Sequence, residues 1–216
     1  SCRLPIYQAY LVDRLNLRLP SPDDPSWQRR RQESGEIRKR MVAAYLSLCS
    51  ELGVVPRYAS SDMLMKMSDH CMRDFLVQLE QVFRHSGKGI RDFLKMRVPL
   101  DVQNAALRQA GDEKRQSLPR SGVAAPEQTG RVVDGLAKAT ALLQSKGEGA
   151  EHLRSSERGL FEIRWREAEQ MGLASVLDII REAAEAGFLR LLQTESTTWS
   201  FRVHTSLAAA YGFSYR

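Results

Sequence analysis

Apolar residues recur every three or four positions along the first two thirds of this 216-residue chain, and this spacing predicts helices. The expected helices cover about residues 3–19, 36–51, 61–67, 70–85, 99–118 and 130–144. Ser60 or Ser61 is expected to cap the third of them and Asp69 the fourth, because short polar side chains accept hydrogen bonds from the free N–H groups of a first turn. A segment with three prolines, 20–25, ends the first helix. This part of the chain is therefore expected to be all-helical.

The last third combines an amphipathic helix with segments of alternating polarity. Leu160 to Trp165 alternates as a short strand, whereas Ala174 to Gly187 has helical spacing and ends in a glycine. Phe188 to Leu192 and Trp199 to Leu207 are strand-like runs on either side of the polar stretch 193–198, which suits a hairpin tip. A helix, a strand, a short helix, a longer helix and a hairpin, in this order, are typical of a winged helix. This module contacts nucleic acid more often than it contacts protein.

Residues 116–129 are rich in Ser, Pro, Gly and Ala, a composition typical of a linker between folded parts. We therefore expect a helical bundle over residues 1–118, a linker over 119–130 and a winged-helix domain over 131–216, with the two folded parts packing independently. The predicted fold class is mainly α: a small helical bundle followed by an α+β winged-helix domain.

The net charge of +6 is unevenly distributed between these two parts. Through Gly122 the chain has 21 Lys and Arg against 14 Asp and Glu, whereas the remainder has 11 against 12. If the partner is nucleic acid, attraction to its phosphates should therefore come mainly from the front part.

The sequence lacks the motifs typical of several classes of protein. No run of about eighteen apolar residues is present, so neither a membrane span nor a membrane partner is expected. The three cysteines and four histidines are scattered without the spacing of a zinc site, which favours a reducing, cytoplasmic setting. The sequence contains no phosphate-binding loop and no Ser/His/Asp, Cys/His or paired-carboxylate set. We expect no catalytic residue and no metal site in this chain.

Basic and hydroxyl side chains are the candidates for contacts with DNA. In and around the predicted hairpin they are Arg190, Thr197, Thr198 and Arg202, and in the front part they include Lys88 and Arg91. Such side chains bind backbone phosphates without reading the bases, although basic runs are also common on faces that only contact water. The polar face of the 174–187 helix carries three carboxylates and one arginine, which suits a DNA groove poorly. Any binding to duplex DNA is therefore expected to be weak and phosphate-mediated.

Arg73 lies in the first turn of the predicted helix 70–85. A cation there opposes the helix dipole, but the position becomes favourable once an anion reaches the free N–H groups of that turn. The alternative interpretation is a surface arginine that pairs with Asp69 or Asp74.

The segment Arg73-Asp74-Phe75-Leu76 resembles the second sensor of the AAA+ P-loop ATPases, in the origin-recognition (ORC/CDC-type) branch and its bacterial relatives. Residues 98–108 are similar to the helix that follows in those proteins, and residues 201–216 to their last strand and tail. The likeness covers roughly residues 36–216. It implies a lid-like helical bundle, in which Arg73 approaches the terminal phosphates of a nucleotide, and a winged helix that binds duplex DNA.

This resemblance implies the lid and winged-helix portion of an ORC/CDC-like ATPase, which couples nucleotide state to duplex DNA binding. The strand-rich ATPase core is absent from the sequence, so ATP or ADP with Mg²⁺ would be bound by a longer parent protein and not by this fragment alone. The parent would form a homo-oligomer or bind a partner subunit. Two alternatives remain open: a protein-interaction module whose acidic helix contacts a partner, and a stand-alone winged-helix regulator whose front helices dimerise.

Overall fold

The computed structural model describes residues 45–145, 159–194 and 197–214, and the helix expected at 3–19 lies outside this part of the chain. Residues 45–51 are helical and belong to the helix expected at 36–51. The elements that follow are α3 (Ser61–Met67), α4 (Met72–Ser86), α5 (Ile90–Phe93), α6 (Leu100–Gln116), η1 (Leu118–Arg120), α7 (Pro126–Ser145), β1 (Leu160–Arg164), α9 (Trp165–Gln170), α10 (Ala174–Glu185), β2 (Leu189–Thr194), β3 (Thr198–Val203), η2 (Thr205–Leu207) and α11 (Ala208–Tyr211). A mainly helical chain with one small sheet confirms the predicted fold class.

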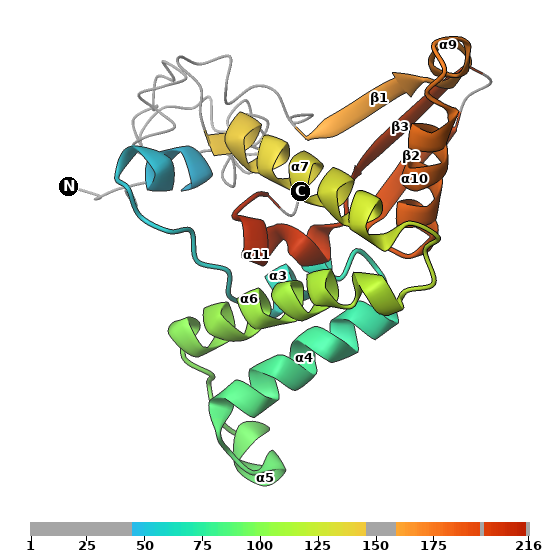
Figure 1. Cartoon of the computed structure of the whole chain (residues 1–216). Coiled ribbons are helices and arrows are strands. Elements are labelled where there is room, and N and C mark those ends of the chain that lie inside the picture. Colours follow the sequence, from blue (N-terminus) through green and yellow to red (C-terminus); the bar gives the residue numbers. More distant parts are fainter. Residues whose placement is uncertain (1–44, 146–158, 195–196, 215–216) are drawn as a thin grey trace, which may run out of the picture.

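The front helices are organised around α4 and α6, which pack against each other in the lower half of Figure 1. Ser60 caps α3 as expected, because its hydroxyl accepts a hydrogen bond of 3.1 Å from the N–H of Met63. On α4, Val82 is buried and Phe75 packs against the same core. The helix ends at Gly87, whose φ of 61° costs a glycine little.

The expected start of α4 is wrong. The helix begins at Met72 with Cys71 as its N-cap residue, and no side chain caps it. Asp69 and His70 instead have φ values of 50° and 64°, which are uncommon for residues with a Cβ atom. The physical reason lies elsewhere in the chain: the Asp69 carboxylate forms salt bridges with two arginines of the hairpin and is not available as a cap.

The winged-helix part occupies the upper right of Figure 1 and contains a three-stranded antiparallel sheet. Its strands lie in the order β1-β3-β2, so the last strand is central. The predicted alternation places Trp199, Phe201 and Val203 on one face of β3. Phe201 is stacked on Phe161 of β1, with ring centroids 5.9 Å apart, and both residues belong to the core.

The turn from α10 into β2 follows the expected glycine. Gly187 has a φ of 78°, and its N–H donates to the carbonyl oxygen of Ala184 over 3.0 Å. The N–H of Phe188 donates to the carbonyl oxygen of Ala183 over 2.8 Å, which completes a Schellman motif. The prediction of a helix that stops at this glycine is therefore confirmed.

The second strand of the hairpin is shorter than expected. It ends at Val203, and the sequence up to Leu207 forms the 3-10 turn η2 instead of a strand. The imidazole of His204 accepts a hydrogen bond from the N–H of Ser206, which folds the backbone back and leads it into α11. An alternating pattern cannot reveal such a local side-chain bond.

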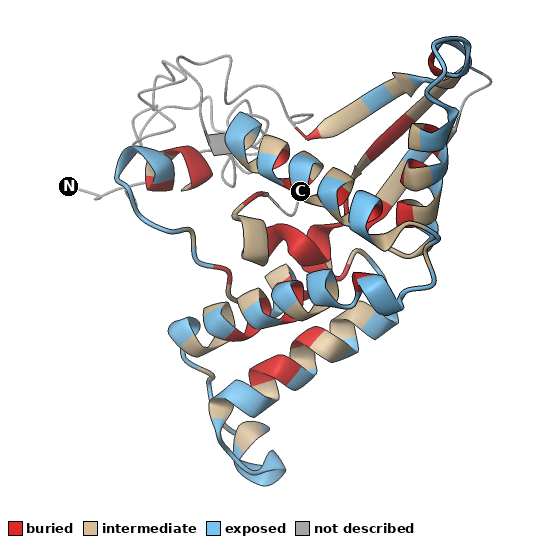
Figure 2. Ribbon diagram, viewed as in Figure 1, coloured by how far each residue is buried: buried red, intermediate tan, exposed pale blue. Residues whose placement is uncertain are grey.

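One buried cluster joins the front helices to the winged-helix part. Met67 and Leu107 come from α3 and α6, whereas Phe188 and Leu207 come from the hairpin region, and none of the four is more than 1% exposed. Figure 2 shows α11 as a largely buried element between the two parts. The expectation of two independently packed parts is therefore wrong for the described residues, although the boundaries at 119–130 stay a prediction.

A single carboxylate ties three helices together at the other side of this core. Asp134 of α7 accepts two hydrogen bonds from the Arg115 guanidinium of α6, at 2.9 and 2.7 Å, and one from the Tyr211 hydroxyl of α11. The hydrogen bond from Arg115 holds the pKa of Asp134 below its usual value despite partial burial. Burial and the same carboxylate raise the pKa of Tyr211. These bonds fix α7 against α6.

The close approach of α6 and α11 gives a first prediction. A Cβ atom on Gly111 would lie 2.9 Å from the Cβ of Ala210 and 3.3 Å from the carbonyl oxygen of Ser206. We expect Gly111→Ala to lower the free energy of unfolding by about 1–3 kcal/mol, because a packed helix cannot easily move aside. Gly135→Ala in α7 is the matched control: nothing lies within 4 Å of its Cβ position, so it should stabilise by about 0.5–1 kcal/mol. Denaturant titrations measure both, and equal effects would contradict the close packing.

Candidate functional site

Arg73 is the second residue of α4, and its side chain is exposed. The two carboxylates that could have neutralised it have other partners: Asp69 pairs with the hairpin arginines and Asp74 with Lys114. Within the described part of the chain Arg73 forms no salt bridge. The first turn of α4 also lacks a side-chain cap, so N–H groups of that turn are free beside the exposed Arg73. This geometry suits an anion.

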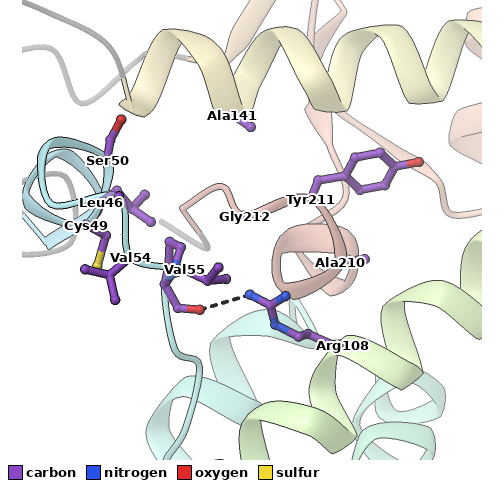
Figure 3. Close-up of a pocket in the computed structure, with 12 residues that line it drawn as sticks. Leu46, Cys49, Ser50, Val54, Val55, Arg108, Ala141, Ala210, Tyr211 and Gly212 are labelled. Carbon is purple, nitrogen blue, oxygen red and sulfur yellow. Dashed lines mark hydrogen bonds between the residues drawn. The ribbon is translucent and has the colours of Figure 1, made fainter.

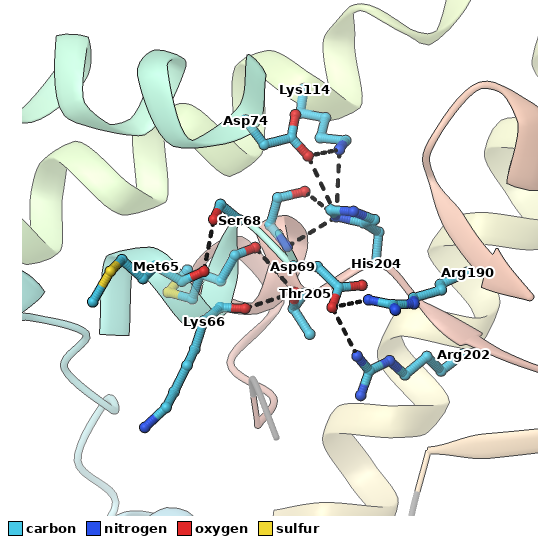
Figure 4. A network of polar contacts seen from close by, with 12 residues as sticks. Met65, Lys66, Ser68, Asp69, Asp74, Lys114, Arg190, Arg202, His204 and Thr205 are labelled. Carbon is cyan, nitrogen blue, oxygen red and sulfur yellow. Dashed lines mark hydrogen bonds and ion pairs between the residues drawn. The ribbon is translucent and has the colours of Figure 1, made fainter. Parts of the chain in front are cut away.

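The loop before this turn holds the base of the hairpin. The side chain of Asp69 is only 7% exposed and forms salt bridges with Arg190 of β2 and, at 3.1 Å, with Arg202 of β3 (Figure 4). Burial opposes ionisation of this carboxyl, but the hydrogen bond from Arg190 and the charges of both arginines outweigh it and lower the pKa of Asp69. Asp69 is therefore ionised and links residues more than a hundred positions apart.

A second polar cluster lies beside it, between α4, α6 and the end of β3. Lys114 donates to the Asp74 carboxylate over 2.6 Å, and the Nδ1 atom of His204 lies 3.4 Å from the Lys114 ammonium and 3.5 Å from Asp74. Burial lowers the pKa of Lys114, Asp74 opposes this, and the charge of Arg73 adds to the lowering. The exposed arginine is thus electrostatically linked to the buried cluster.

Backbone contacts complete the junction shown in Figure 4. The hydroxyl of Thr205 donates to the carbonyl oxygens of Met67 and Lys66, at 3.0 and 3.3 Å. His204 Nδ1 also lies 2.7 Å from the hydroxyl of Ser206. Hydrogen bonds therefore join the end of α3 to the residues that follow β3.

The structure separates the residues predicted to contact DNA into three places. Arg190 and Arg202 meet at Asp69, at the base of the hairpin. Thr197 and Thr198 lie at its tip, where Thr197 is exposed, about 13 Å along the strand from Arg202. Lys88, which precedes α5, and Arg91, its second residue, are exposed. This helix lies at the end of the molecule opposite the strands (Figure 1). They do not form one continuous basic surface.

The polar face of α10 is largely occupied by internal contacts. Arg181 pairs with Asp178 at 3.1 Å, and its guanidinium lies 5.5 Å from the ring centroid of Trp199. Glu182 accepts a hydrogen bond of 2.9 Å from the backbone N–H of Ala124, so it holds α10 to the segment before α7. These contacts leave little of the helix face available to read bases.

A cavity of about 340 Å³ lies between residues 45–56, α6, α7 and α11 (Figure 3). Its lining is mostly apolar, and Arg108 is the charged side chain in it. The Arg108 guanidinium donates to the carbonyl oxygen of Pro56 over 3.2 Å. None of the residues predicted to contact a nucleotide or DNA lines this cavity.

The sequence matches the family model described as ORC-CDC6-like over residues 3–216. The chain belongs to the ORC-CDC6-like family. This membership confirms the resemblance drawn from residues 73–76 and the segments that follow them. No curated protein and no solved structure matches the sequence significantly.

In the described part of this ORC-CDC6-like chain, no helix is long and apolar enough to cross a bilayer. The same residues contain no group of three or more His, Cys, Asp or Glu side chains placed to hold a metal ion.

The polar junction at Asp69, Asp74, Lys114 and His204 was not predicted from the sequence. Local patterns gave no signal for it, since its partners lie on four segments that come together only in the folded chain. The one available hint was His204, a polar residue at the end of an apolar strand.

The junction makes stability depend on pH. Burial and the charge of Lys114 lower the pKa of His204 to about 4, although Asp74 and Asp69 oppose this, so the folded chain binds the proton less readily than an unfolded chain with the ordinary value of 6.5. We expect the free energy of unfolding to decrease as pH falls from about 6.5 to about 4, by up to about 3 kcal/mol. The contribution of Asp69, whose pKa is lowered, is lost only below its ordinary value of 3.8.

Denaturant titrations at stepped pH measure this profile. His204→Asn should flatten it, whereas His85→Asn, at an exposed position on α4, should leave it unchanged. A slope that survives His204→Asn would assign the pH dependence to other groups.

Proposed function

We propose that this chain is the lid and winged-helix portion of an ORC-CDC6-like ATPase and couples nucleotide state to duplex DNA binding. The observation that carries this is the position of Arg73: it is exposed in the first turn of α4, without a salt bridge in the described part of the chain. The residues beside it hold the base of the winged-helix hairpin. A ligand at this turn therefore has a direct structural route to the DNA-binding module.

The nucleotide would be ATP or ADP with Mg²⁺, bound mainly by a core outside this chain. The residues present fit one part of that task, since a free guanidinium at a helix N-terminus suits a terminal phosphate. Arg73 is the residue that would contact it. Metal ligands would have to come from the parent protein.

The DNA would be held through its phosphates. Thr197 at the hairpin tip and Lys88 and Arg91 near α5 are the exposed candidates, and Thr198 is half-buried. Arg190 and Arg202 share their charge with Asp69. Family membership also supports assembly with further subunits, either copies of the parent or a partner. The free thiols of Cys49 and Cys71 are in keeping with the cytoplasm as the compartment.

The acidic face of α10 favours one alternative, a protein-interaction module. Asp178 and Glu185 are exposed there and would repel phosphates. Binding of a basic protein partner through this face, without any DNA binding by the chain, would favour that function over the one proposed.

Arg73→Ala in the full-length parent tests the nucleotide role. We expect it to weaken nucleotide-dependent DNA binding by about 1.5–3 kcal/mol, the cost of one charged hydrogen bond. The unfolding free energy of the present chain should change by less than about 0.5 kcal/mol, since Arg73 is exposed. Arg84→Ala is the control, because Arg84 is exposed at the other end of α4 and pairs with Glu80. If both variants bind DNA like the wild type, Arg73 is not a sensor.

Binding to duplexes of unrelated sequence tests the DNA role. We expect weak binding that depends on salt and hardly on sequence, because the contacts available are to phosphates. Arg91→Ala should weaken all sequences alike and reduce the slope of log K against log salt by about 0.9. Arg120→Ala removes the same charge at an exposed position of η1 and should leave the slope unchanged. Tight binding at high salt that discriminates between sequences would contradict phosphate-only contacts.

A further inference from the structure

A groove of about 390 Å³ runs between α10 and β2, next to the loop that joins α3 to α4. Arg181 and Arg190 line it, and with them the carboxylates of Asp69 and Glu185. Two arginines beside the exposed helix of a winged helix are suited to a backbone phosphate. The carboxylates in the same groove oppose that use.

Among the residues that line this groove, Asp69 is the one placed between Arg190 and Arg202. Arg190 and Arg202 are directly opposite each other on β2 and β3, so both side chains leave the same face of the sheet. The Asp69 carboxylate lies between them and pairs with both, as Figure 4 shows. A single anionic group held by two guanidinium groups is the arrangement that a phosphate would adopt there.

In the arrangement in which Asp69 pairs with both arginines, called closed below, some buried polar atoms lack hydrogen bonds within the described part of the chain. Asp69 Oδ2 and Arg202 Nε are buried without a hydrogen-bond partner among the described residues. Asp69 and His70 both hold left-handed backbone conformations that residues with a Cβ atom rarely adopt. Unpaired buried polar atoms and backbone strain both raise the energy of the closed arrangement, which makes an open one accessible.

We propose that Asp69 is an intramolecular latch, whose carboxylate occupies Arg190 and Arg202 in place of a DNA backbone phosphate. This inference rests on the DNA-binding function proposed above. The arginines contact DNA only when residues 68–71 shift and release them. Because this loop leads directly into the first turn of α4, an anion on Arg73 acts on the same stretch of backbone.

Asp69→Asn in the present chain tests the latch. Asparagine also tolerates a left-handed backbone, so the substitution removes the charge and preserves the loop. Asp112→Asn is the matched control, because Asp112 is exposed on α6, pairs with neither Arg190 nor Arg202 and does not line the groove. Affinity for a mixed-sequence DNA duplex is measured over a salt series for the wild type and both variants.

We expect Asp69→Asn to bind more tightly than either other protein at low salt. Two additional phosphate contacts steepen the plot of log K against log salt by about 1.8, so this advantage should shrink about tenfold between about 50 and 200 mM salt. Adding Arg190→Ala to Asp69→Asn should remove about half of the extra slope. Equal behaviour of Asp69→Asn and Asp112→Asn would overturn the latch.

Arg190→Ala alone keeps the test decisive if Asp69→Asn does not fold. An arginine held by Asp69 contributes little to DNA binding, so the affinity of Arg190→Ala for DNA should differ from that of the wild type by less than about twofold, with an unchanged salt slope. A salt slope lower by about 0.9 would overturn the latch. If the wild type binds DNA at least as tightly as Asp69→Asn, the latch is wrong but the proposed DNA-binding function stands. If neither protein binds duplex DNA, the proposed function is wrong and the latch with it.

Discussion

A layer of buried charge between the front helices and the hairpin is the constraint on which the rest of the structure depends. Asp69 faces Arg190 and Arg202, and Asp74 faces Lys114, with all the carboxylates at most 15% exposed. Charges removed from water are tolerated only when their partners are in place, and loss of one partner leaves the other uncompensated. The partners of Asp69 come from β2 and β3. The two parts of the chain therefore have to fold together, in keeping with the single core that crosses between them.

The same layer relates the exposed end of α4 to the winged helix. Arg73 projects into solvent, whereas the next residue, Asp74, reaches inward to Lys114 and lies 3.5 Å from His204. The body of α4 is packed along α6, which holds the helix in place below its first turn. A phosphate at Arg73 would change the field at Lys114, since its charge already acts on that ammonium. Packing and electrostatics thus connect the outer and inner faces of one helical turn.

Sequence patterns predicted the elements better than their connections. The Schellman turn at Gly187 and the Ser60 cap were readable because each depends on neighbours within a few residues. The start of α4 was misread because the preference of Asp69 for an N-cap yielded to arginines 121 and 133 positions away, a separation that no local pattern encodes. The shared core was missed for the same reason, whereas the end of β3 was missed because a local bond of the His204 side chain replaces the strand. Family membership, in contrast, was recoverable from short motifs, since a motif is a local pattern of residues.

The contacts of α10 limit how the winged helix can be used. A helix that reads bases needs free donors and acceptors along one face. Here Arg181 is engaged by Asp178 and by the ring of Trp199, and Glu182 is engaged by a backbone N–H of Ala124. Using Glu182 to contact DNA would break its bond to the segment before α7, and moving Arg181 would lose its contact with the Trp199 ring. At the tip of the hairpin, Thr197 is exposed. At its base, Arg190 and Arg202 are held by one carboxylate, that of Asp69. If the chain binds DNA as proposed, control over its affinity would therefore lie at the base of the hairpin, in the pairing of Asp69, and not in α10, the helix that other winged helices use for recognition.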